Sequence, residues 1–441
     1  MDSADAIPES AWSALDRLSS IPLWAWAAGA VVGAFGIIVL AYTTLLLIAP
    51  KPRPPRASEK QFITVQADGT VSKLQPLPCW YDNHVALTQM AREKQISPEE
   101  AYQISDAEVF MSLVVPAYNE EERLSGMLEE AVEYLEEQYG HHGTPSKSSS
   151  NGSLQASGQQ GDKWRGWEII VVSDGSRDRT VQTALQFAKT HQLNRSPPVP
   201  NGPWHGKNNA KPTNIPPGTI RVVQLEQNRG KGGAVTHGMR HARGTYVVFA
   251  DADGASKFTD LGKIVQSCEK VKDEQGRAVG VGSRAHMVGT EAVVKVFFLS
   301  MASAASSESC ITVLLDAESD FTDLPSQRSF LRNTLMRAFH LLIWTLTTPR
   351  TSHIKDTQCG FKLFSRPALP YIIPYMHSEG WIFDVEMLML AESADIPMTE
   401  VAIGWKEVKG SKLNVIKDSL GMAWGLAMLR VCWGAGIYKR D

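Results

Sequence analysis

The chain has 441 residues, of which 43% are hydrophobic and 21% charged, and this composition indicates a globular protein rather than a disordered one. Its formal net charge of −3 at pH 7 excludes the global basic field that attracts nucleic acid, so no nucleic-acid partner is expected. The five cysteines are scattered and lack Cys-x-x-Cys spacing, which argues against a disulfide framework or a zinc finger and favours a reducing compartment.

The first predicted element is an uncharged, mostly apolar stretch at residues 21–49. As a helix it would extend ~43 Å, more than the roughly 30 Å hydrocarbon core of a bilayer. The segment before it is acidic, unlike the start of a cleaved signal peptide, so we expect one uncleaved transmembrane helix. Basic residues follow at once, and the positive-inside rule then predicts that residues 1–20 are lumenal and that residues 50–108 form a cytosolic juxtamembrane linker.

From residue 109 onward, apolar strands alternate with amphipathic helices, the pattern of parallel βαβ units. Helical spacing of apolar residues follows each of the first two strands, and a helix to about His241 is expected after the third; Asn119 is placed to cap the first of these helices. The pattern predicts an α/β catalytic domain over residues 109–412. Its predicted strands are residues 111–115, 168–172, 221–225 and 246–250.

Three segments interrupt this alternation. Residues 144–162 are rich in Ser, Gly and Gln, and residues 195–218 are rich in Pro and Asn, so both are expected to be exposed loops. Residues 296–327 have neither helical nor strand periodicity, and they open on a Val and close on a Gln. Since Val codons begin with GT and a Gln codon can be CAG, this segment is interpreted as an intron translated in frame; an ordinary long loop is the alternative.

The C-terminal tail, residues 413–441, combines many apolar residues with recurring charges. Because charges recur along it, we expect an amphipathic, interfacial helix that lies against the membrane rather than crossing it. A helix packed on the protein core is the alternative.

Asp251-Ala252-Asp253 follows directly on the predicted strand 246–250. In open α/β sheets ligands bind beyond the carboxyl ends of the strands, so two carboxylates are presented where a ligand would lie. Such a pair suits Mg²⁺ or Mn²⁺ bound together with the diphosphate of a nucleotide sugar. Taken alone, Asp-x-Asp is also common in solvated turns.

The order of four strand-end motifs is itself informative: Val-Val-Pro-Ala-Tyr-Asn-Glu-Glu at 114–121, Val-Ser-Asp-Gly-Ser-Arg-Asp at 172–178, Asn-Arg-Gly-Lys-Gly-Gly-Ala at 228–234 and Ala-Asp-Ala-Asp-Gly at 250–254. Together they resemble the inverting glycosyltransferases of family 2, whose GT-A fold is a Rossmann-like, mixed and mostly parallel sheet flanked by helices. Motifs at 281–287, 356–364 and 381–388 resemble the dolichyl-phosphate β-glucosyltransferases within that family.

The resemblance implies transfer of glucose from UDP-glucose to dolichyl phosphate, with inversion, at the endoplasmic reticulum membrane and for N-glycan assembly. Metal binding is then expected at Asp251 and Asp253, with Mg²⁺ or Mn²⁺ as the cofactor and Asp253 also catalytic. The other expected substrate-binding residues are Pro116, Ala117, Tyr118, Glu120, Asp174, Lys231, Gln358 and Lys412. Core packing is the alternative for Tyr118, and helix capping is the alternative for Asp174.

The acceptor side follows from the same resemblance. A phosphate monoester loses its second proton near pH ~6, so the acceptor arrives as an anionic nucleophile and needs no general base. Arg284 and Arg332 match the acceptor-phosphate arginines of the family, and Lys412 is a third cation. Asp384 is expected to orient the sugar or the acceptor, whereas in relatives that act on hydroxyl groups a carboxylate in this region is the base.

Three other functions compete with this one. They are a mannose synthase-like enzyme that uses GDP-mannose, a catalytically silent nucleotide-binding scaffold, and a Rossmann oxidoreductase, which the missing Gly-x-Gly-x-x-Gly disfavours. A zinc site at His237 and His241 is also disfavoured, since their helix lacks the His-Glu-x-x-His glutamate.

Overall fold

A computed structural model describes residues 22–140, 165–193, 202–204, 215–287, 346–408 and 415–440. The loop predicted at 144–162, most of the loop predicted at 195–218, the segment 296–327, Arg332 and Lys412 lie outside the described residues. The chain divides into two compact units, one of residues 51–427 and one of residues 1–50 with residues 428–441.

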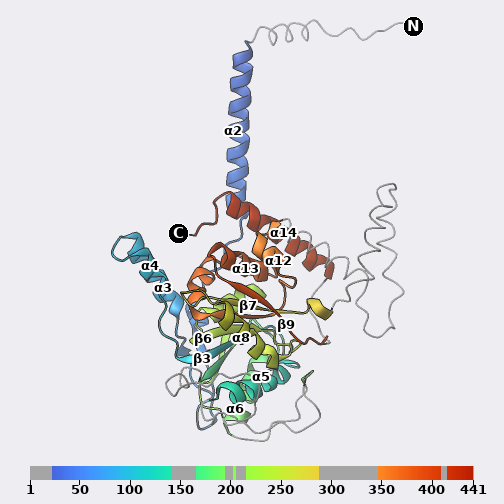
Figure 1. The fold of residues 1–441 in the computed structure, drawn as a ribbon. Coiled ribbons are helices and arrows are strands. Elements are labelled where there is room, and N and C mark those ends of the chain that lie inside the picture. Colours follow the sequence, from blue (N-terminus) through green and yellow to red (C-terminus); the bar gives the residue numbers. More distant parts are fainter. Residues whose placement is uncertain are drawn as a thin grey trace, which may run out of the picture. The chain divides into compact units, whose positions relative to one another are not determined.

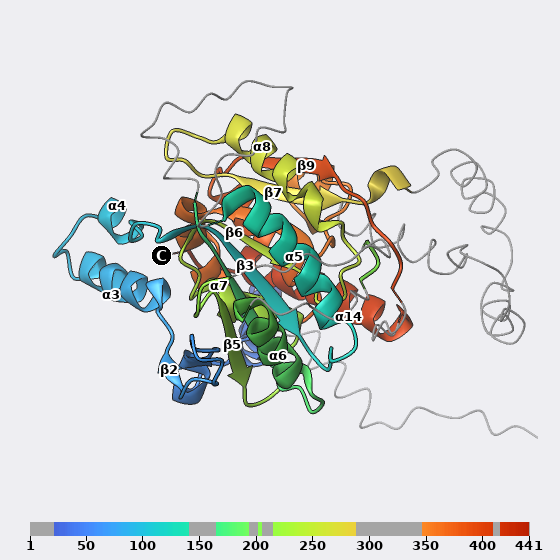
Figure 2. The same cartoon turned by 90° about the horizontal axis from the view of Figure 1, so that it is seen from below.

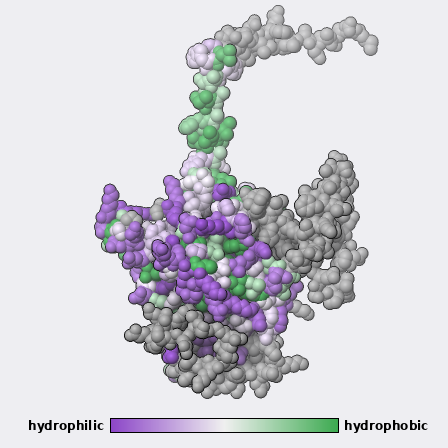
Figure 3. Space-filling view, in the orientation of Figure 1, coloured by the Kyte–Doolittle hydropathy of each residue, from purple (hydrophilic) through white to green (hydrophobic). Residues whose placement is uncertain are grey.

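The smaller unit contains the long apolar helix α2 (Leu23–Ile48), whose residues Figure 3 colours mostly as hydrophobic. Its most apolar 18-residue window has a mean hydropathy of 2.5, and no residue of the helix is buried. By length and composition α2 is able to cross a membrane, as the sequence predicted for residues 21–49. After the helix, the Pro50 carbonyl accepts a hydrogen bond of 2.6 Å from the Tyr438 hydroxyl.

The larger unit is built on one sheet, of which Figure 1 labels β3, β6, β7 and β9. Among the described residues this sheet has nine strands, in the order β2-β1-β5-β4-β3-β6-β8-β7-β9. All of the strands run in one direction except β1 and β8, so the sheet is mixed and mostly parallel. The strands are β1 (Gln61–Ile63), β2 (Gln75–Pro76), β3 (Val109–Ala117), β4 (Trp167–Asp174), β5 (Ile220–Leu225), β6 (Gly244–Ala250), β7 (Val279–Ser283), β8 (Phe361–Ser365) and β9 (Met398–Ala402).

The four predicted strands are confirmed as β3, β4, β5 and β6. Every residue of β4 is buried, because helices cover both faces of the sheet. A strand buried on both sides is a continuous apolar run rather than an alternating one, and this explains why these four strands were recognisable in the sequence.

Helices α5 (Leu124–Tyr139), α6 (Thr180–Gln192) and α8 (Leu261–Val271) lie on one face of the sheet, and α7 (Lys231–Met239) and α13 (Phe383–Ser393) lie on the other (Figures 1 and 2). The packing of α7 is close: a Cβ at Gly238 would lie 2.5 Å from a Val114 methyl group of β3. A larger residue at this position would therefore push the helix off the sheet.

Residues 50–108, predicted as a linker, contribute to the sheet. β1 pairs with β5 and β2 pairs with β1, while the Trp80 indole donates to the Met239 carbonyl at 2.7 Å. The remaining elements are α3 (Trp80–Arg92), α4 (Pro98–Ala101), α12 (Pro349–His353), α14 (Val415–Gly434) and the 3₁₀ turns Ala57–Lys60, Phe258–Asp260, Ala285–Met287, Arg366–Tyr371 and Ile373–Tyr375.

Candidate active site

The predicted donor residues meet at one edge of the sheet. β3, β4, β5 and β6 are parallel, so their carboxyl ends lie on the same edge. Asp174 is the last residue of β4, and Tyr118, the loop before Lys231 and Asp251 come directly after β3, β5 and β6. This edge is where ligands bind in open α/β sheets, and the described structure brings the four motifs together there.

Lys231 and Asp251 form an ion pair across two of these strand ends. Lys231 Nζ lies 2.6 Å from Asp251 Oδ1, and the two side chains are 15% and 34% exposed. Lys231 begins α7, and Gly230 before it has a φ of 85°, a left-handed conformation that glycine adopts freely. Burial disfavours the charged ammonium, but the carboxylates of Asp251, Asp384 and Asp253 outweigh it and raise the pKa of Lys231.

Asp253 has one oxygen held by the backbone and one turned toward a cation. Its Oδ1 accepts a hydrogen bond of 3.0 Å from the Ala255 N–H, and its Oδ2 lies 3.9 Å from Arg123 Nη1. Arg123 is fixed by Glu120, whose two oxygens each accept a hydrogen bond of 2.7 Å from it. Burial and then repulsion from Asp251 raise the pKa of Asp253, so the pair of aspartates gains from a nearby cation.

Asp251 is also tied to the later motif at 356–364. Its N–H donates to the Gly360 carbonyl at 3.2 Å. A Cβ at Gly360 would lie 2.1 Å from Asp251 Oδ2, so only glycine leaves room for this carboxylate. The predicted substrate-binding residue Gln358 is two positions earlier, and its side-chain amide contacts the Met422 sulfur at 2.8 Å.

Asp174 holds the loop that precedes Lys231 and does not cap the helix that follows β4. Its two oxygens accept hydrogen bonds from the N–H groups of Arg229 and Gly230, at 2.7 and 2.9 Å. The helix α6 is instead preceded by Arg179, without a side-chain cap. Burial raises the pKa of Asp174 to about 6, although both hydrogen bonds oppose this rise. The capping alternative for Asp174 is therefore wrong.

The residues at the end of β3 differ in exposure. Pro116 pairs with Val172 in the sheet, and Ala117 is buried in the hydrophobic core. Tyr118 is 38% exposed at the strand end, which argues against plain core packing. Asn119 does not cap α5, because its φ is 54° and its side-chain oxygen accepts a hydrogen bond of 2.8 Å from the Arg177 N–H.

Arg284, predicted to hold the acceptor phosphate, follows β7 and is engaged by a carboxylate. Its Nε and Nη2 donate to the two oxygens of Asp356 at 2.7 and 2.8 Å. The guanidinium also lies 5.7 Å from the centre of the Trp405 ring. Burial opposes its charge, but the hydrogen bond to Asp356 raises the pKa of Arg284, which stays cationic. The other predicted cations, Arg332 and Lys412, are not among the described residues.

Asp384 lies at the start of α13 and is almost completely buried. Its Oδ1 accepts a hydrogen bond from the Lys362 ammonium, which also donates to the Cys359 carbonyl at 2.7 Å. Burial raises the pKa of Asp384, whereas Lys362 and Lys231 act against this rise. Asp384 thus belongs to a buried ion pair, and its charge also acts on Lys231 at the carboxyl ends of the parallel strands.

The donor set fits a hard divalent cation. Asp251 and Asp253 offer carboxylate oxygens, which Mg²⁺ and Mn²⁺ prefer, and each side chain remains partly exposed. Within the described ranges no group of three or more His, Cys, Asp or Glu residues is arranged to hold a metal, so a diphosphate and water would have to complete the shell. His237 and His241 are buried, and their ring nitrogens contact the carbonyls of Glu59 and Pro78, each at 2.8 Å.

Three residues at this edge, Arg123, Asp356 and Lys362, were not among the predicted site residues. The sequence held a weak signal for Lys362, because it is the one charged residue of the strand Phe361–Ser365. Asp356 lies in a quoted motif, but its pairing with Arg284 joins positions far apart in the chain. Arg123 is not part of any of the motifs, and only the folded structure places it beside Asp253.

Residues 112–274 match the family described as Glycosyl transferase family 2. The dolichyl-phosphate beta-glucosyltransferase of Saccharomyces cerevisiae is 34% identical over 410 residues, covering 91% of this chain and 92% of that protein. The enzyme of the same description from Drosophila melanogaster is 35% identical over 330 residues, covering 75% of this chain and 77% of that protein.

Among solved structures, glucosyl-3-phosphoglycerate synthase from Mycobacterium tuberculosis, in complex with Mn²⁺, uridine diphosphate and glucosyl-3-phosphoglycerate, is 14% identical. Its TM-score is 0.40, with 73% of this chain and 80% of that chain covered, and so distant a likeness carries no argument about the site. The sequence relatives are far closer, and on their identity and coverage this chain belongs to the dolichyl-phosphate beta-glucosyltransferase family and is a glycosyltransferase.

Proposed function

We propose that this enzyme transfers glucose from UDP-glucose to dolichyl phosphate, with inversion, giving dolichyl β-D-glucosyl phosphate and UDP for N-glycan assembly. The observation that carries the proposal is the grouping of Lys231, Asp251 and Asp253 at the shared strand end. One ammonium beside two carboxylates forms a mixed-charge site, suited to a diphosphate together with a divalent cation.

Asp251 and Asp253 would hold Mg²⁺ or Mn²⁺, which would act as a Lewis acid on the departing UDP. Lys231 neutralises part of the diphosphate charge, and its raised pKa keeps it protonated at neutral pH. Asp174 fixes the loop that presents Lys231, through the N–H groups of Arg229 and Gly230. Tyr118, Glu120 and Pro116 complete the proposed nucleotide pocket at the end of β3.

On the acceptor side, Arg284 provides positive charge for the dolichyl phosphate, and Asp356 holds its guanidinium in one orientation. The phosphate is itself the nucleophile, so the chain needs no general base. Asp384 forms an ion pair with Lys362, so we assign it a role in positioning the sugar or the acceptor rather than the role of a general base. Arg332 and Lys412 remain proposed contacts of the acceptor, and Gln358 of the donor.

The proposed location is the endoplasmic reticulum membrane, with α2 as a single span, residues 1–20 lumenal and the catalytic domain cytosolic. The length and hydropathy of α2 support a span, and the basic residues after it support this orientation. The lipid acceptor requires the active site to work at a membrane surface.

The proposal is tested by incubating membranes that contain the full-length protein with dolichyl phosphate, Mn²⁺ and either labelled UDP-glucose or labelled GDP-mannose. We expect labelled lipid from UDP-glucose alone, and the anomeric linkage in that lipid to be β. Labelling from GDP-mannose, or an α linkage, would contradict the proposed reaction. Membranes from cells without the protein supply the background.

A further inference from the structure

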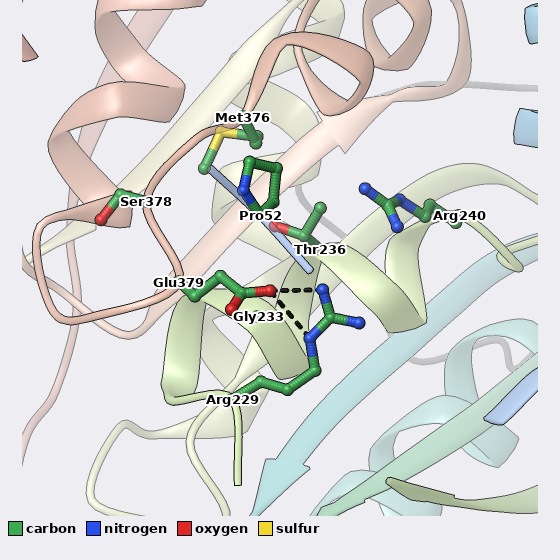
Figure 4. Close-up of a pocket in the computed structure, with 8 residues that line it drawn as sticks. All are labelled: Pro52, Arg229, Gly233, Thr236, Arg240, Met376, Ser378 and Glu379. Atoms are coloured by element: carbon green, nitrogen blue, oxygen red, sulfur yellow. Dashed lines mark hydrogen bonds and ion pairs between the residues drawn. The ribbon is translucent and has the colours of Figure 1, made fainter. Parts of the chain in front are cut away.

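A small cavity lies behind the loop that carries Lys231, between α7, the segment that follows α2, and the loop before α13 (Figure 4). Its volume is about 10 Å³, close to the space of one water molecule. Arg229, Thr236 and Arg240 line it from the α7 side, and Pro52 and Glu379 line it from the other segments. None of these residues is assigned to the donor or the acceptor.

Three polar atoms on the α7 side lack a hydrogen-bond partner among the described residues. They are Arg229 Nη1, Thr236 Oγ1 and Arg240 Nε. All three residues are more than nine-tenths buried, with exposed fractions of 8%, 7% and 7%. A buried donor without a partner costs about 1–3 kcal/mol, so three such atoms around one cavity indicate that an acceptor binds there.

The charges around the cavity do not balance. Arg229 forms an ion pair with Glu379, as Figure 4 shows, so this carboxylate balances the charge of only one of the two arginines. No carboxylate of the described structure lies within ion-pair distance of Arg240, whose guanidinium stacks on the Tyr81 ring at 4.5 Å. Burying an unpaired charge costs several kcal/mol, and a water molecule would leave that charge uncompensated, whereas an anion would neutralise it.

The cavity opens beside the residues that follow the apolar helix. Pro52 and Glu379 on its rim are partly exposed, so a group larger than water can place a single oxygen inside. Pro52 comes four positions after Ile48, the last residue of α2 (52 − 48). Lys51, beside it in the chain, adds further positive charge. The oxygens of a phosphate group are the acceptors that arginine binds best.

We infer that this cavity is a second anion site, which takes an oxygen of the phosphate group of an anionic phospholipid. Arg240 and Arg229 supply positive charge, and the Thr236 hydroxyl donates a hydrogen bond. Bound there, the lipid would brace the loop that presents Lys231, because Arg229 and Gly230 belong to that loop. The inference concerns a site apart from the one used for glucosyl transfer and is tested without measuring activity.

The test uses the full-length chain in phosphatidylcholine bilayers, with phosphatidic acid added or with diacylglycerol added as the phosphate-free control. We expect phosphatidic acid to raise the thermal midpoint of the wild type by about 2–5 °C, and diacylglycerol to leave it unchanged. Arg240→Gln should lose this rise. In phosphatidylcholine alone, Arg240→Gln should be at least as stable as the wild type, because it removes an uncompensated buried charge.

Thr236→Val should lose part of the rise, which keeps the test informative if Arg240→Gln does not fold. Arg92→Gln, at an exposed arginine of α3, is the matched control and should keep the rise in full. An equal rise with inorganic phosphate in phosphatidylcholine alone would support the phosphate site but overturn the lipid as its ligand. No rise in the wild type, or an equal rise in Arg240→Gln, would overturn the site.

Discussion

Two lysine–aspartate pairs of this enzyme have the same chemistry and different surroundings. Lys231 and Asp251 are 15% and 34% exposed at the end of β6, where two further carboxylates, Asp384 and Asp253, act on Lys231. Lys362 and Asp384 are 0% and 3% exposed, between β8 and α13. The first pair is able to exchange its partners for a ligand, whereas the second pair is sealed from solvent.

The difference has an energetic cause. In a partly hydrated pair, each charge keeps some of its water, and breaking the pair costs little. In a sealed pair, removing one partner strands the other as a buried charge. We therefore interpret Lys231 and Asp251 as groups of the donor site, and Lys362 and Asp384 as a fixed support that positions α13 beside it.

The largest expected effect comes from breaking the sealed pair. Lys362→Met should lower the free energy of unfolding by about 3–5 kcal/mol, because Asp384 is left buried without its cation. Chemical denaturation of the purified protein measures this loss. Adding Asp384→Leu to the same chain should recover most of the stability, and a double variant as unstable as the single one would show that the pair is not the cause.

Asp253→Asn should reduce kcat/KM for glucosyl transfer by roughly 100-fold or more, because it removes a carboxylate proposed to hold the metal. Stability should change little, since the substitution also removes repulsion between Asp253 and Asp251. Kinetics and thermal unfolding of the same preparation separate the two effects. An activity loss matched by a loss of folded protein would remove the evidence for a catalytic role.

Arg284→Lys tests the acceptor side of the proposed active site. A lysine keeps the charge but loses the two-pronged contact with Asp356, so the KM for dolichyl phosphate should rise by roughly 10-fold with a smaller effect on the KM for UDP-glucose. Steady-state kinetics with each substrate varied in turn provide the measurement. A rise confined to the KM for UDP-glucose would move Arg284 to the donor side.

Lys231→Met is the counterpart of Lys362→Met in the open pair. Its cost in stability should be about 1 kcal/mol or less, because Asp251 is partly hydrated, while the KM for UDP-glucose should rise. Denaturation and donor kinetics together check this expectation. A stability loss as large as that of Lys362→Met would erase the distinction between the two pairs.

A further effect concerns the pH dependence of stability. Burial lowers the pKa of His237 to about 4 and that of His241 to about 3, so both are neutral in the folded chain. Unfolding lets each bind a proton below its ordinary pKa of 6.5, and stability is therefore lost as pH falls below that value. Between pH ~6.5 and ~5 each histidine should account for roughly 2 kcal/mol.

The His241→Gln variant should lose less stability than the wild type over this range, as unfolding measured at each pH would show. The difference between the two proteins is the quantity to compare. Burial raises the pKa of Asp174 to about 6 and that of Glu130 to about 7, so their contributions have the opposite sign and are lost as pH rises from ~4. Equal pH profiles for the two proteins would contradict the assignment of neutral histidines.

The sheet and the donor edge were predictable from local sequence, because β3, β4 and β6 are apolar runs that end in polar motifs. The short strands β1 and β2 were not, because neither is an apolar run and β1 joins the sheet only through a tertiary contact with β5, while β2 pairs with β1. Contacts within the active site were equally hard to predict, because they too join residues far apart in the chain. Asp174 lies at the end of a strand, close to where it was predicted, but its contact with the Lys231 loop depends on a partner far away in sequence.

The central claim is that the open carboxylates at the end of β6 bind the metal together with the sugar donor. Electron paramagnetic resonance of Mn²⁺, titrated into the full-length protein with and without UDP-glucose, tests it most directly. We predict tight binding of Mn²⁺ only when UDP-glucose is present, with loss of that binding in Asp253→Asn. Equal Mn²⁺ binding in the wild type and in Asp253→Asn would contradict the claim.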